Sequence, residues 1–326
     1  MNILIVCTYF PPQNSIASLR PYSWAKYWSR WGHNVTVVTT PKPFHPANLN
    51  LPYTGFNVCQ VPILGERMHH FLLKLQDNKL NSRTASMYSH IAKLLTSFLH
   101  DFVATLRVKY GCFLARSPDV HDLWVLRALS AVNHTRWDAV ISTGWPYSTH
   151  FVGYFLKRQG KARIWVLDWR DLWTLRNPYP GLPILRMLEQ YIEQKFHIQA
   201  DTITTVSEPL SNLIRQRVGD KVKVIYNGFD EEDYDTLAKE RIFPADNVFR
   251  IVYTGTIYPD KRDPTPLFRA IKILEVQGKI SPKVLQVVIA GYNADVADIA
   301  QREQVTEYIN HVGFVARQDA LRMQRD

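Results

Sequence analysis

The start of the chain constrains the fold most, because residues 2–39 have the pattern of a β-α-β unit. Residues 2–8 form a short, nearly continuous apolar run, which is typical of a strand buried on both faces. Residues 16–31 carry apolar side chains at helical spacing, and Gly32 follows where such a helix is expected to end. Residues 35–39 form a second apolar run. Two parallel strands joined by a helix indicate an α/β fold.

The same alternation continues along the rest of the 326 residues. Further strands are expected at 57–62, 138–143, 163–168, 222–225, 249–255, 284–291 and 308–315. Helices are expected at 68–109, 147–159, 184–199, 208–217, 267–277, 294–303 and 318–326.

The pattern pauses at an acidic and proline-containing stretch, residues 230–247, and then restarts. This length and this pause predict two domains, residues 1–235 and 236–326. The second domain holds only three expected strands and stops within a helix-like run. We therefore expect it to be incomplete and the chain to be C-terminally truncated.

Composition excludes several classes of protein. With 46% hydrophobic and 21% charged residues, the chain is neither disordered nor of low complexity. Its three cysteines are far apart and form no C-x-x-C pair, which argues against a disulfide framework and a zinc ribbon. The first residues lack the basic start of a signal peptide, and no apolar run reaches the ~18 residues of a spanning helix. We expect a cytoplasmic protein or one attached to a membrane face.

The positive charge is concentrated in the first part of the chain. Residues 1–120 hold 12 Lys and Arg against 4 Asp and Glu, a net charge of +8, whereas residues 121–326 hold 27 against 25, a net charge of +2. Such a distribution favours an anionic partner. Because no helix-turn-helix, zinc-finger or RNP-type signature is present, we do not expect nucleic acid. The basic and apolar segment 68–109 could lie in a membrane interface or pack on the sheet.

Polar residues follow several expected strands, at the edge where open α/β sheets bind ligands. The loop before the helix at 16–31 offers free backbone N–H groups to a phosphate, but it lacks the G-x-G-x-x-G glycines of a nicotinamide site. Asp168, Arg170 and Asp171 could bind a ligand or form an ion pair that fixes a loop. His150, in the first turn of the next helix, could contact a ligand or be structural.

A second candidate site begins after the first strand of the second domain. Gly255 and Thr256 are followed by the paired cations Lys261 and Arg262. These cations could neutralise a diphosphate, with arginine supplying a bidentate fork. The alternative is a solvated turn that carries two charges.

Taken in order, these segments resemble glycosyltransferase family 4 and its relatives with the GT-B fold. The resemblance rests on residues 9–12, 31–39, 168–173, 200–207, 224–230, 253–261 and 312–315. It implies two Rossmann-like domains with parallel sheets facing across a cleft, the first binding the acceptor and the second a nucleotide-sugar donor. It also implies transfer with retention and no cofactor or required metal, with the donor phosphate helping to deprotonate the acceptor.

The resemblance assigns the donor site residue by residue. Backbone amides at Asn14 and Ser15 would approach the donor diphosphate, where the family usually has a Gly-Gly pair. Lys261 matches the family's phosphate-binding lysine. Arg262 would replace the partner arginine, which in the family commonly follows Gly255, at the position of Thr256.

The remaining assignments concern the base and the chemistry. Gly313 and Phe314 match a turn whose backbone meets the base of the donor. His150 resembles a cleft histidine that touches the donor sugar. Asp171 resembles a cleft carboxylate for acceptor or sugar hydroxyls. These two residues are the predicted catalytic pair.

The function implied is that of a retaining, hexosyltransferase-type glycosyltransferase in cell-surface polysaccharide biosynthesis. Its donor would be a UDP- or GDP-linked sugar, and its acceptor an anionic or lipid-linked glycan at the inner membrane face, where the protein would be peripheral. The family's Glu-(seven residues)-Glu motif would follow residue 326, so this chain alone is expected to be nearly inactive. The alternatives are a GT-B nucleotide-sugar epimerase or hydrolase and a non-catalytic partner that kept the fold.

Overall fold

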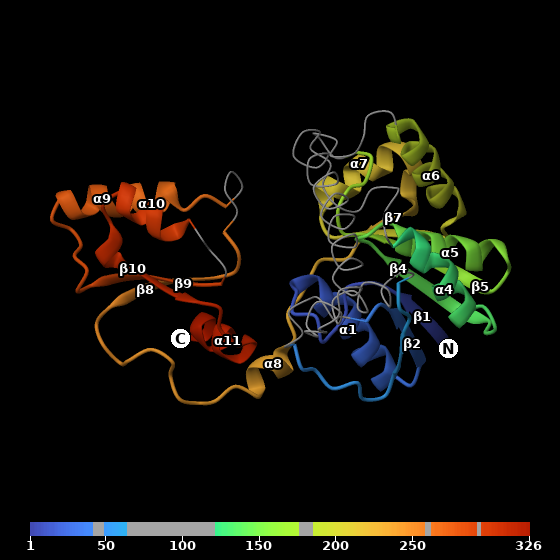
Figure 1. Cartoon of the computed structure of the whole chain (residues 1–326), viewed down its shortest axis with the longest axis horizontal. Helices are drawn as coiled ribbons and strands as arrows, with labels where there is room; N and C mark the ends of the chain where they lie inside the picture. The colour runs from blue at the N-terminus through green and yellow to red at the C-terminus, as the bar shows by residue number, and fades with distance from the viewer. Residues whose placement is uncertain (42–48, 64–120, 176–184, 258–261, 292–294) are drawn as a thin grey trace, which may run out of the picture. The chain divides into compact units, whose positions relative to one another are not determined.

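The computed structural model describes residues 1–41, 49–63, 121–175, 185–257, 262–291 and 295–326. The chain forms two compact units, Met1–Gly228 and Phe229–Asp326 (Figure 1). The sequence placed the boundary after Asp235, whereas the units divide after Gly228. The short helix α8 (Glu231–Asp235) goes with the second unit, since Asp233 pairs with Arg317 at 2.6 Å. The helices expected at 68–109 lie outside the described residues.

The first unit is built on a seven-stranded sheet in which all neighbouring strands are parallel, with the order β3-β2-β1-β4-β5-β6-β7. The strands are β1 (Asn2–Val6), β2 (Asn34–Thr39), β3 (Asn57–Gln60), β4 (Trp137–Thr143), β5 (Ala162–Trp169), β6 (Thr202–Thr205) and β7 (Val222–Val224). The order runs one way from β1 to β3 and the other way from β4 to β7. The sheet therefore has a topological switch point between β1 and β4.

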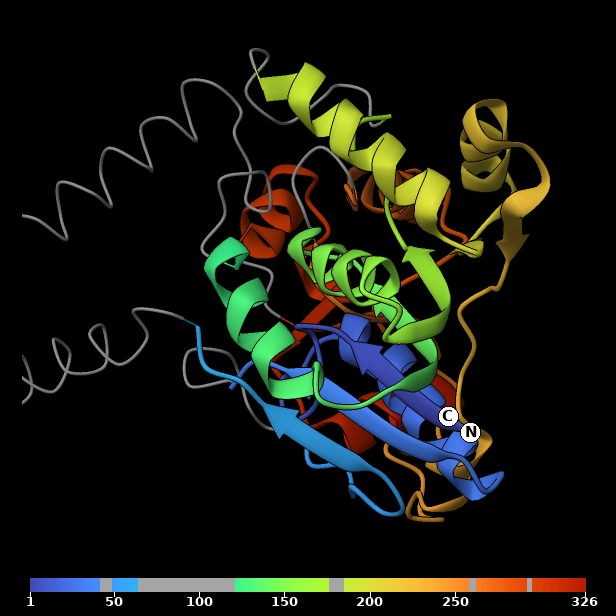
Figure 2. The ribbon, with the colours of Figure 1, turned by 90° about the vertical axis from the view of Figure 1, so that its right-hand side faces the viewer.

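Helices cover both faces of this sheet. The described helices of the unit are α1 (Ile16–Arg30), α4 (Asp122–Val132), α5 (Ser148–Arg158), α6 (Arg186–Gln199) and α7 (Glu208–Val218), with the short 3₁₀ turn η2 (Gly219–Lys221). Alternate residues of β1 enter different cores: Ile3 and Ile5 pack with Tyr22 of α1, whereas Leu4 and Val6 belong to the core that α4 to α7 cover. Figure 2 shows α5 lying along one face of the strands. This burial on both faces explains the apolar run at the start of the chain.

The second unit has a smaller parallel sheet with the order β10-β9-β8. Its elements are β8 (Phe249–Thr254), α9 (Thr265–Val276), β9 (Leu285–Ala290), α10 (Val296–Arg302), the 3₁₀ turn η3 (Thr306–Tyr308), β10 (Ile309–Gly313) and α11 (Arg317–Arg325). Phe268 and Ile271 of α9 pack with Val287 and Ile289 of β9 in its core. Both units are thus α/β with parallel sheets, as the sequence predicted.

Strand β6 was not predicted, because three of its four residues are threonine and no apolar run marks it. In the sheet it lies between β5 and β7, where Thr204 and Thr205 are buried. The Thr204 hydroxyl donates to the Asp168 carboxylate at 2.7 Å. A partner from another strand therefore makes a polar strand stable in the interior.

Close packing of α5 on β5 gives a test of the fold. A Cβ atom on Gly153 would lie 2.7 Å from Cε2 of the Trp165 indole. We expect Gly153→Ala to destabilise the first unit by about 1–3 kcal/mol, because overpacking outweighs the better helix propensity of alanine. All nine tryptophans lie in the first unit, so urea unfolding followed by tryptophan fluorescence measures this unit.

The matched control is the same change in a Trp165→Phe background. The smaller ring leaves room for the methyl group, so alanine should cost much less there. An equal cost in both backgrounds would contradict the packing argument.

Candidate functional site

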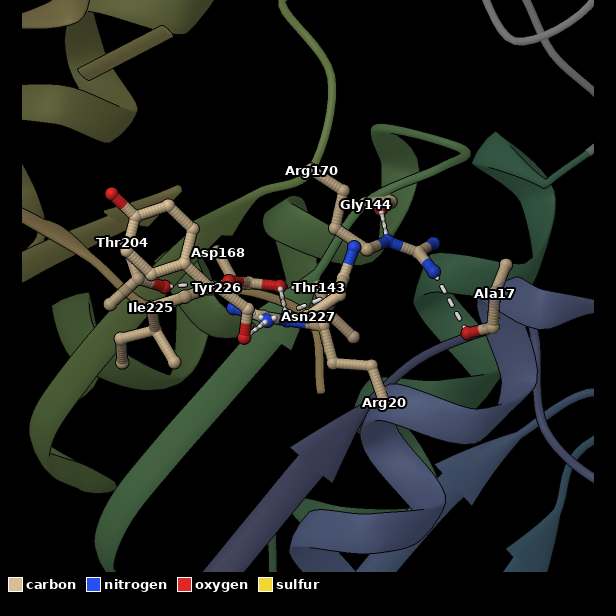
Figure 3. A network of polar contacts seen from close by, with 10 residues as sticks. All are labelled: Ala17, Arg20, Thr143, Gly144, Asp168, Arg170, Thr204, Ile225, Tyr226 and Asn227. Carbon is tan, nitrogen blue, oxygen red and sulfur yellow. Dashed lines mark hydrogen bonds and ion pairs between the residues drawn. The ribbon is translucent and has the colours of Figure 1, made fainter. Parts of the chain in front are cut away.

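The candidate site lies at the carboxyl edge of the first sheet, around its switch point. The loops that follow β1, β4 and β5 meet there, and the segment after β7 joins them through hydrogen bonds (Figure 3). Ligands of open α/β sheets bind outside the carboxyl ends of the strands at such a point. The polar side chains gathered there decide what this edge can bind.

Asp168, the penultimate residue of β5, is fully buried at the centre of this network. Sheet register places Thr143 and Thr204 directly beside it, and each hydroxyl donates to one carboxylate oxygen at 2.7 Å. Arg20 of α1 donates to both oxygens, from Nη2 at 2.9 Å and from Nε at 3.3 Å. Such a bidentate pair saturates the carboxylate. Asp168 therefore holds the fold together and has no free oxygen for a ligand.

Arg20 also holds the segment that follows β7. Its Nη1 donates to the Ile225 carbonyl at 2.9 Å, to the Tyr226 carbonyl at 3.3 Å and to Oδ1 of Asn227 at 3.2 Å. The guanidinium also lies over the ring of Trp24, 4.8 Å from its centroid. One side chain thus links α1, β5 and the last residues of the first unit.

Arg170 is the second arginine of the network, and its partners are all uncharged. Its Nε donates to the Gly144 carbonyl at 2.5 Å and its Nη1 to the Ala17 carbonyl at 2.8 Å. The guanidinium lies 5.8 Å from the centroid of the Tyr9 ring. Burial lowers its pKa from the usual value for arginine. No carboxylate forms an ion pair with Arg170 in the described ranges, although the nearby charges of Asp168 and Asp171 act to raise its pKa and so offset part of the effect of burial.

The sequence left open an ion pair within the segment 168–171. The structure forms an ion pair on Asp168, but the arginine is Arg20, which is 148 residues away. Sequence reasoning missed Arg20, Thr143 and Thr204 as members of the network. The one signal for Arg20 was a cation on a helix face that is otherwise rich in aromatic residues.

Three predicted residues of the first unit lie on the loops of this edge. Ser15 is the N-cap of α1, and its Oγ accepts from the Ala17 N–H at 3.3 Å. Asn14, beside it, is half-buried. Asp171 is exposed and directly follows Arg170. Asn14 and Ser15 therefore lie on the loop before α1, and Asp171 lies on the loop after β5. The hydrogen bond from Arg170 to the Ala17 carbonyl connects the second loop to the first turn of α1.

His150, the other predicted catalytic residue, lies beneath this edge and is fully buried. Its Nδ1 is 2.9 Å from Oγ of Ser142, and its ring packs edge-on against Trp169 at 4.4 Å between centroids. Its Nε2 has no hydrogen-bond partner in the described part of the chain and faces Gly144. Burial, with the charge of Arg170 and the nearby His197, lowers its pKa well below the usual value. It is thus a neutral ring that supports the loop after β4.

In the second unit, the predicted residues after β8 lie at the carboxyl edge of the smaller sheet. The Gly255 N–H donates to the Ala290 carbonyl of β9 at 2.9 Å. Arg262 donates to the hydroxyl of Tyr253 at 3.3 Å and to the Thr256 carbonyl at 3.5 Å. Arg262 is therefore folded back onto the loop that carries Thr256. Lys261 lies outside the described residues.

The turn after β10 ends at the same edge, because β8, β9 and β10 are parallel. Gly313 has a φ of +70°, a conformation that favours glycine, and its carbonyl accepts from the Gly291 N–H at 2.7 Å. Phe314 follows and is 60% exposed. Of the six predicted donor-site residues of this unit, the structure brings Gly255, Thr256, Arg262, Gly313 and Phe314 to one edge.

In the described ranges, no group of three or more His, Cys, Asp or Glu side chains could hold a metal ion. None of the helices in the described part of the chain is long and apolar enough to cross a membrane.

The sequence profile of the glycosyl transferase 4-like domain matches residues 18–228, most of the first unit. No curated protein matches the chain.

Similar solved structures span both units. Sucrose-phosphate synthase from Thermosynechococcus elongatus is 12% identical with a TM-score of 0.59, over 99% of this chain and 73% of that one. The catalytic domain of starch synthase IV from Arabidopsis thaliana is 11% identical with a TM-score of 0.54, over 98% of this chain and 75% of that one. The lipopolysaccharide outer core galactosyltransferase WaaB is 10% identical with a TM-score of 0.50, over 100% of this chain and 71% of that one. The shared fold is GT-B.

The buried ion pair gives a first test of the network. Asp168→Asn leaves Arg20 buried without its counter-charge, so we expect a loss of about 3–5 kcal/mol in the free energy of unfolding of the first unit. The control is Glu208→Gln, which removes the exposed pair with Arg215 and should cost less than about 1 kcal/mol. Urea unfolding followed by tryptophan fluorescence compares the two variants. Similar small losses would show that the buried pair does not stabilise the unit.

The buried histidines give a pH dependence. His197 accepts from Nε1 of Trp169, and burial, with the charges of Arg217 and Lys221, lowers its pKa to about 4. Below pH ~6.5 the unfolded chain therefore binds a proton that the folded protein rejects. We expect the stability of the first unit to fall from pH ~6.5 to about 4, with His197 contributing about 3 kcal/mol of the loss.

His197→Gln should reduce this slope, whereas the same change at the exposed His134 should leave it unchanged. Urea unfolding at a series of pH values measures both slopes. A slope that is equal in the two variants would contradict the assignment.

Proposed function

Because the chain belongs to the glycosyl transferase 4-like family, we propose that it transfers a hexose, with retention, from a nucleotide-sugar to a glycan or lipid-linked acceptor in polysaccharide biosynthesis. The first unit would bind the acceptor and the second the donor. The WaaB structure, which shares the fold, is a galactosyltransferase of the lipopolysaccharide outer core, and this supports a glycan acceptor. The starch synthase IV structure is bound to ADP, and this supports a nucleotide donor.

The observation that carries the proposal is the guanidinium of Arg170. Asp168 pairs directly with Arg20, and among the described residues Arg170 has no direct ion-pair partner. The structure assigns acceptors to two of its N–H groups, and a guanidinium has five. A largely buried arginine without a direct ion-pair partner gains from an anion, and its planar fork fits a phosphate. We therefore assign Arg170 to a phosphate of the substrates.

The surroundings of Arg170 support this assignment. Its bond to the Ala17 carbonyl holds it beside the first turn of α1, where helix geometry favours negative charge. Asn14 and Ser15 lie on the loop that enters this helix. A substrate phosphate at this edge would meet both the side chain and the backbone amides.

The proposed reaction needs few groups from the protein. The bond between the sugar C1 and the donor phosphate breaks, a bond from C1 to the acceptor oxygen forms on the same face, and the acceptor proton ends on the released nucleoside diphosphate. Asp171, which is exposed, would bind acceptor or sugar hydroxyls. His150 is buried, so we assign it to positioning of the Gly144 loop rather than to contact with the sugar.

Nucleotide binding tests the donor half of the proposal. We expect calorimetry to show selective binding of UDP, GDP or ADP, and Lys261→Ala to weaken it roughly tenfold or more by removing a charged partner of the diphosphate. Lys239→Ala, a lysine before β8, is the control and should bind as the parent does. Absence of binding to all three nucleotides would favour the non-catalytic alternative.

Sugar transfer tests the role of Arg170. With a donor identified by the binding panel, we expect Arg170→Gln to lower kcat/KM roughly tenfold or more, because the phosphate loses a charged hydrogen-bond donor. Arg158→Gln, on the surface of α5, should transfer at the parent rate. Unchanged kcat/KM in Arg170→Gln would rule out contact with a substrate phosphate.

A further inference from the structure

The outer surface of α6 exposes several apolar side chains among its polar ones. Met187, Tyr191 and Ile198 are 80%, 56% and 62% exposed, and their spacing places them on one face of the helix. Glu189 and Glu193, on the opposite face, are buried. A helix on the surface of a globular protein normally turns its apolar stripe inward and its charges to water. The exposed apolar side chains therefore need another explanation.

The inward carboxylates have a structural reason that does not extend to the outer face. Glu193 accepts hydrogen bonds from the Thr174 hydroxyl and, at 3.3 Å, from Nη1 of Arg217. This network fixes the rotation of α6 on the sheet. It leaves Met187, Tyr191 and Ile198 exposed on one side of the helix.

A pocket of about 710 Å³ runs along this face, between α6 and the end of α7. Met187, Tyr191 and Ile198 give it apolar walls, and the cations Arg217 and Lys221 line it as well. Among the described residues that line it there is no carboxylate. The pocket therefore offers apolar contact and positive charge side by side, which suits a ligand with an anionic head and an apolar body.

The cations around the pocket are held close to the apolar residues. The ammonium of Lys195 lies 4.9 Å from the centroid of the Tyr191 ring. Nζ of Lys221 donates to the carbonyls of Ile198 and Ala200 at 3.2 Å each, at the C-terminal end of α6. Apolar side chains, a tyrosine and cations gathered on one surface are typical of a surface that lies at the boundary between lipid headgroups and acyl chains.

We propose that this α6 face, made of Met187, Tyr191, Lys195, Ile198, Arg217 and Lys221, docks the protein on an anionic lipid bilayer. Met187, Tyr191 and Ile198 enter the interface, while Lys195 and Lys221 meet lipid phosphates. A net charge of +10 adds a long-range attraction to the same surface. Docking would bring the protein to a lipid-linked acceptor. This purpose rests on the proposed function.

Co-sedimentation of the full chain with vesicles tests the proposal. The probes are vesicles of phosphatidylcholine alone and of phosphatidylcholine mixed with phosphatidylglycerol. We expect binding to the anionic vesicles that weakens at high salt, because ions screen the attraction. The double variant Met187→Gln with Ile198→Gln should lower the partition coefficient about tenfold or more, since both side chains are exposed and leave the core unchanged.

The matched controls are Leu126→Gln on α4 and Val276→Gln on α9, which replace apolar residues that are 70% and 78% exposed elsewhere. Both should bind vesicles as the parent does. Lys195→Gln should weaken binding to anionic vesicles only. Absence of binding to anionic vesicles, or equal binding by the parent and the double variant, would overturn the proposal.

A second copy of the chain is the competing occupant of this face. Sedimentation velocity of the parent and the double variant tests it, and a dimer that only the double variant loses, without vesicle binding by either, would overturn bilayer docking.

Nucleotide binding by the same samples separates the two proposals. If the double variant loses vesicle binding but still binds nucleotide, the change concerns docking alone. If the parent binds vesicles but no nucleotide, the transferase proposal is rejected and the docking proposal stands.

Discussion

The carboxylate of Asp168 is the group on which the first unit depends. It lies on the central part of the sheet and takes four hydrogen bonds, from hydroxyls on the two neighbouring strands and from the guanidinium of Arg20. A buried carboxylate is stable only when it is paired and saturated in this way. Because Arg20 also holds residues 225–227, the same ion pair fixes helix α1, three strands and the segment that leads out of the unit.

This saturation decides the chemistry of the carboxyl edge. Asp168 pairs with Arg20, which leaves Arg170 of the described network without a direct ion-pair partner. Its hydrogen bonds to the carbonyls of Gly144 and Ala17 hold it in place. The proposed transfer from a nucleotide-sugar would use a fixed cation at this position, and the fold supplies one from a loop directly after a central strand.

On α6, as at Asp168, a buried carboxylate and its hydrogen-bond partners fix the orientation of the element that carries it. Glu193 is held inward by Thr174 and Arg217, and Met187, Tyr191 and Ile198 then lie on the exposed side of the helix. Catalysis at the carboxyl edge and docking through α6 would therefore use different surfaces of the same unit. Their separation lets the acceptor site and the bilayer contact change independently.

The sequence by itself determined the α/β class, the elements with clear apolar periodicity and the family. These features are local, because a buried parallel strand or a capped helix leaves its pattern in a few consecutive residues. Only the tertiary structure decided that Asp168 pairs with Arg20 rather than Arg170, that the polar strand β6 is stable inside the sheet, and that His150 is buried. Each of these depends on the register of strands or on contacts between residues far apart in the chain, and the free energy of a buried charge is set by its partners in space.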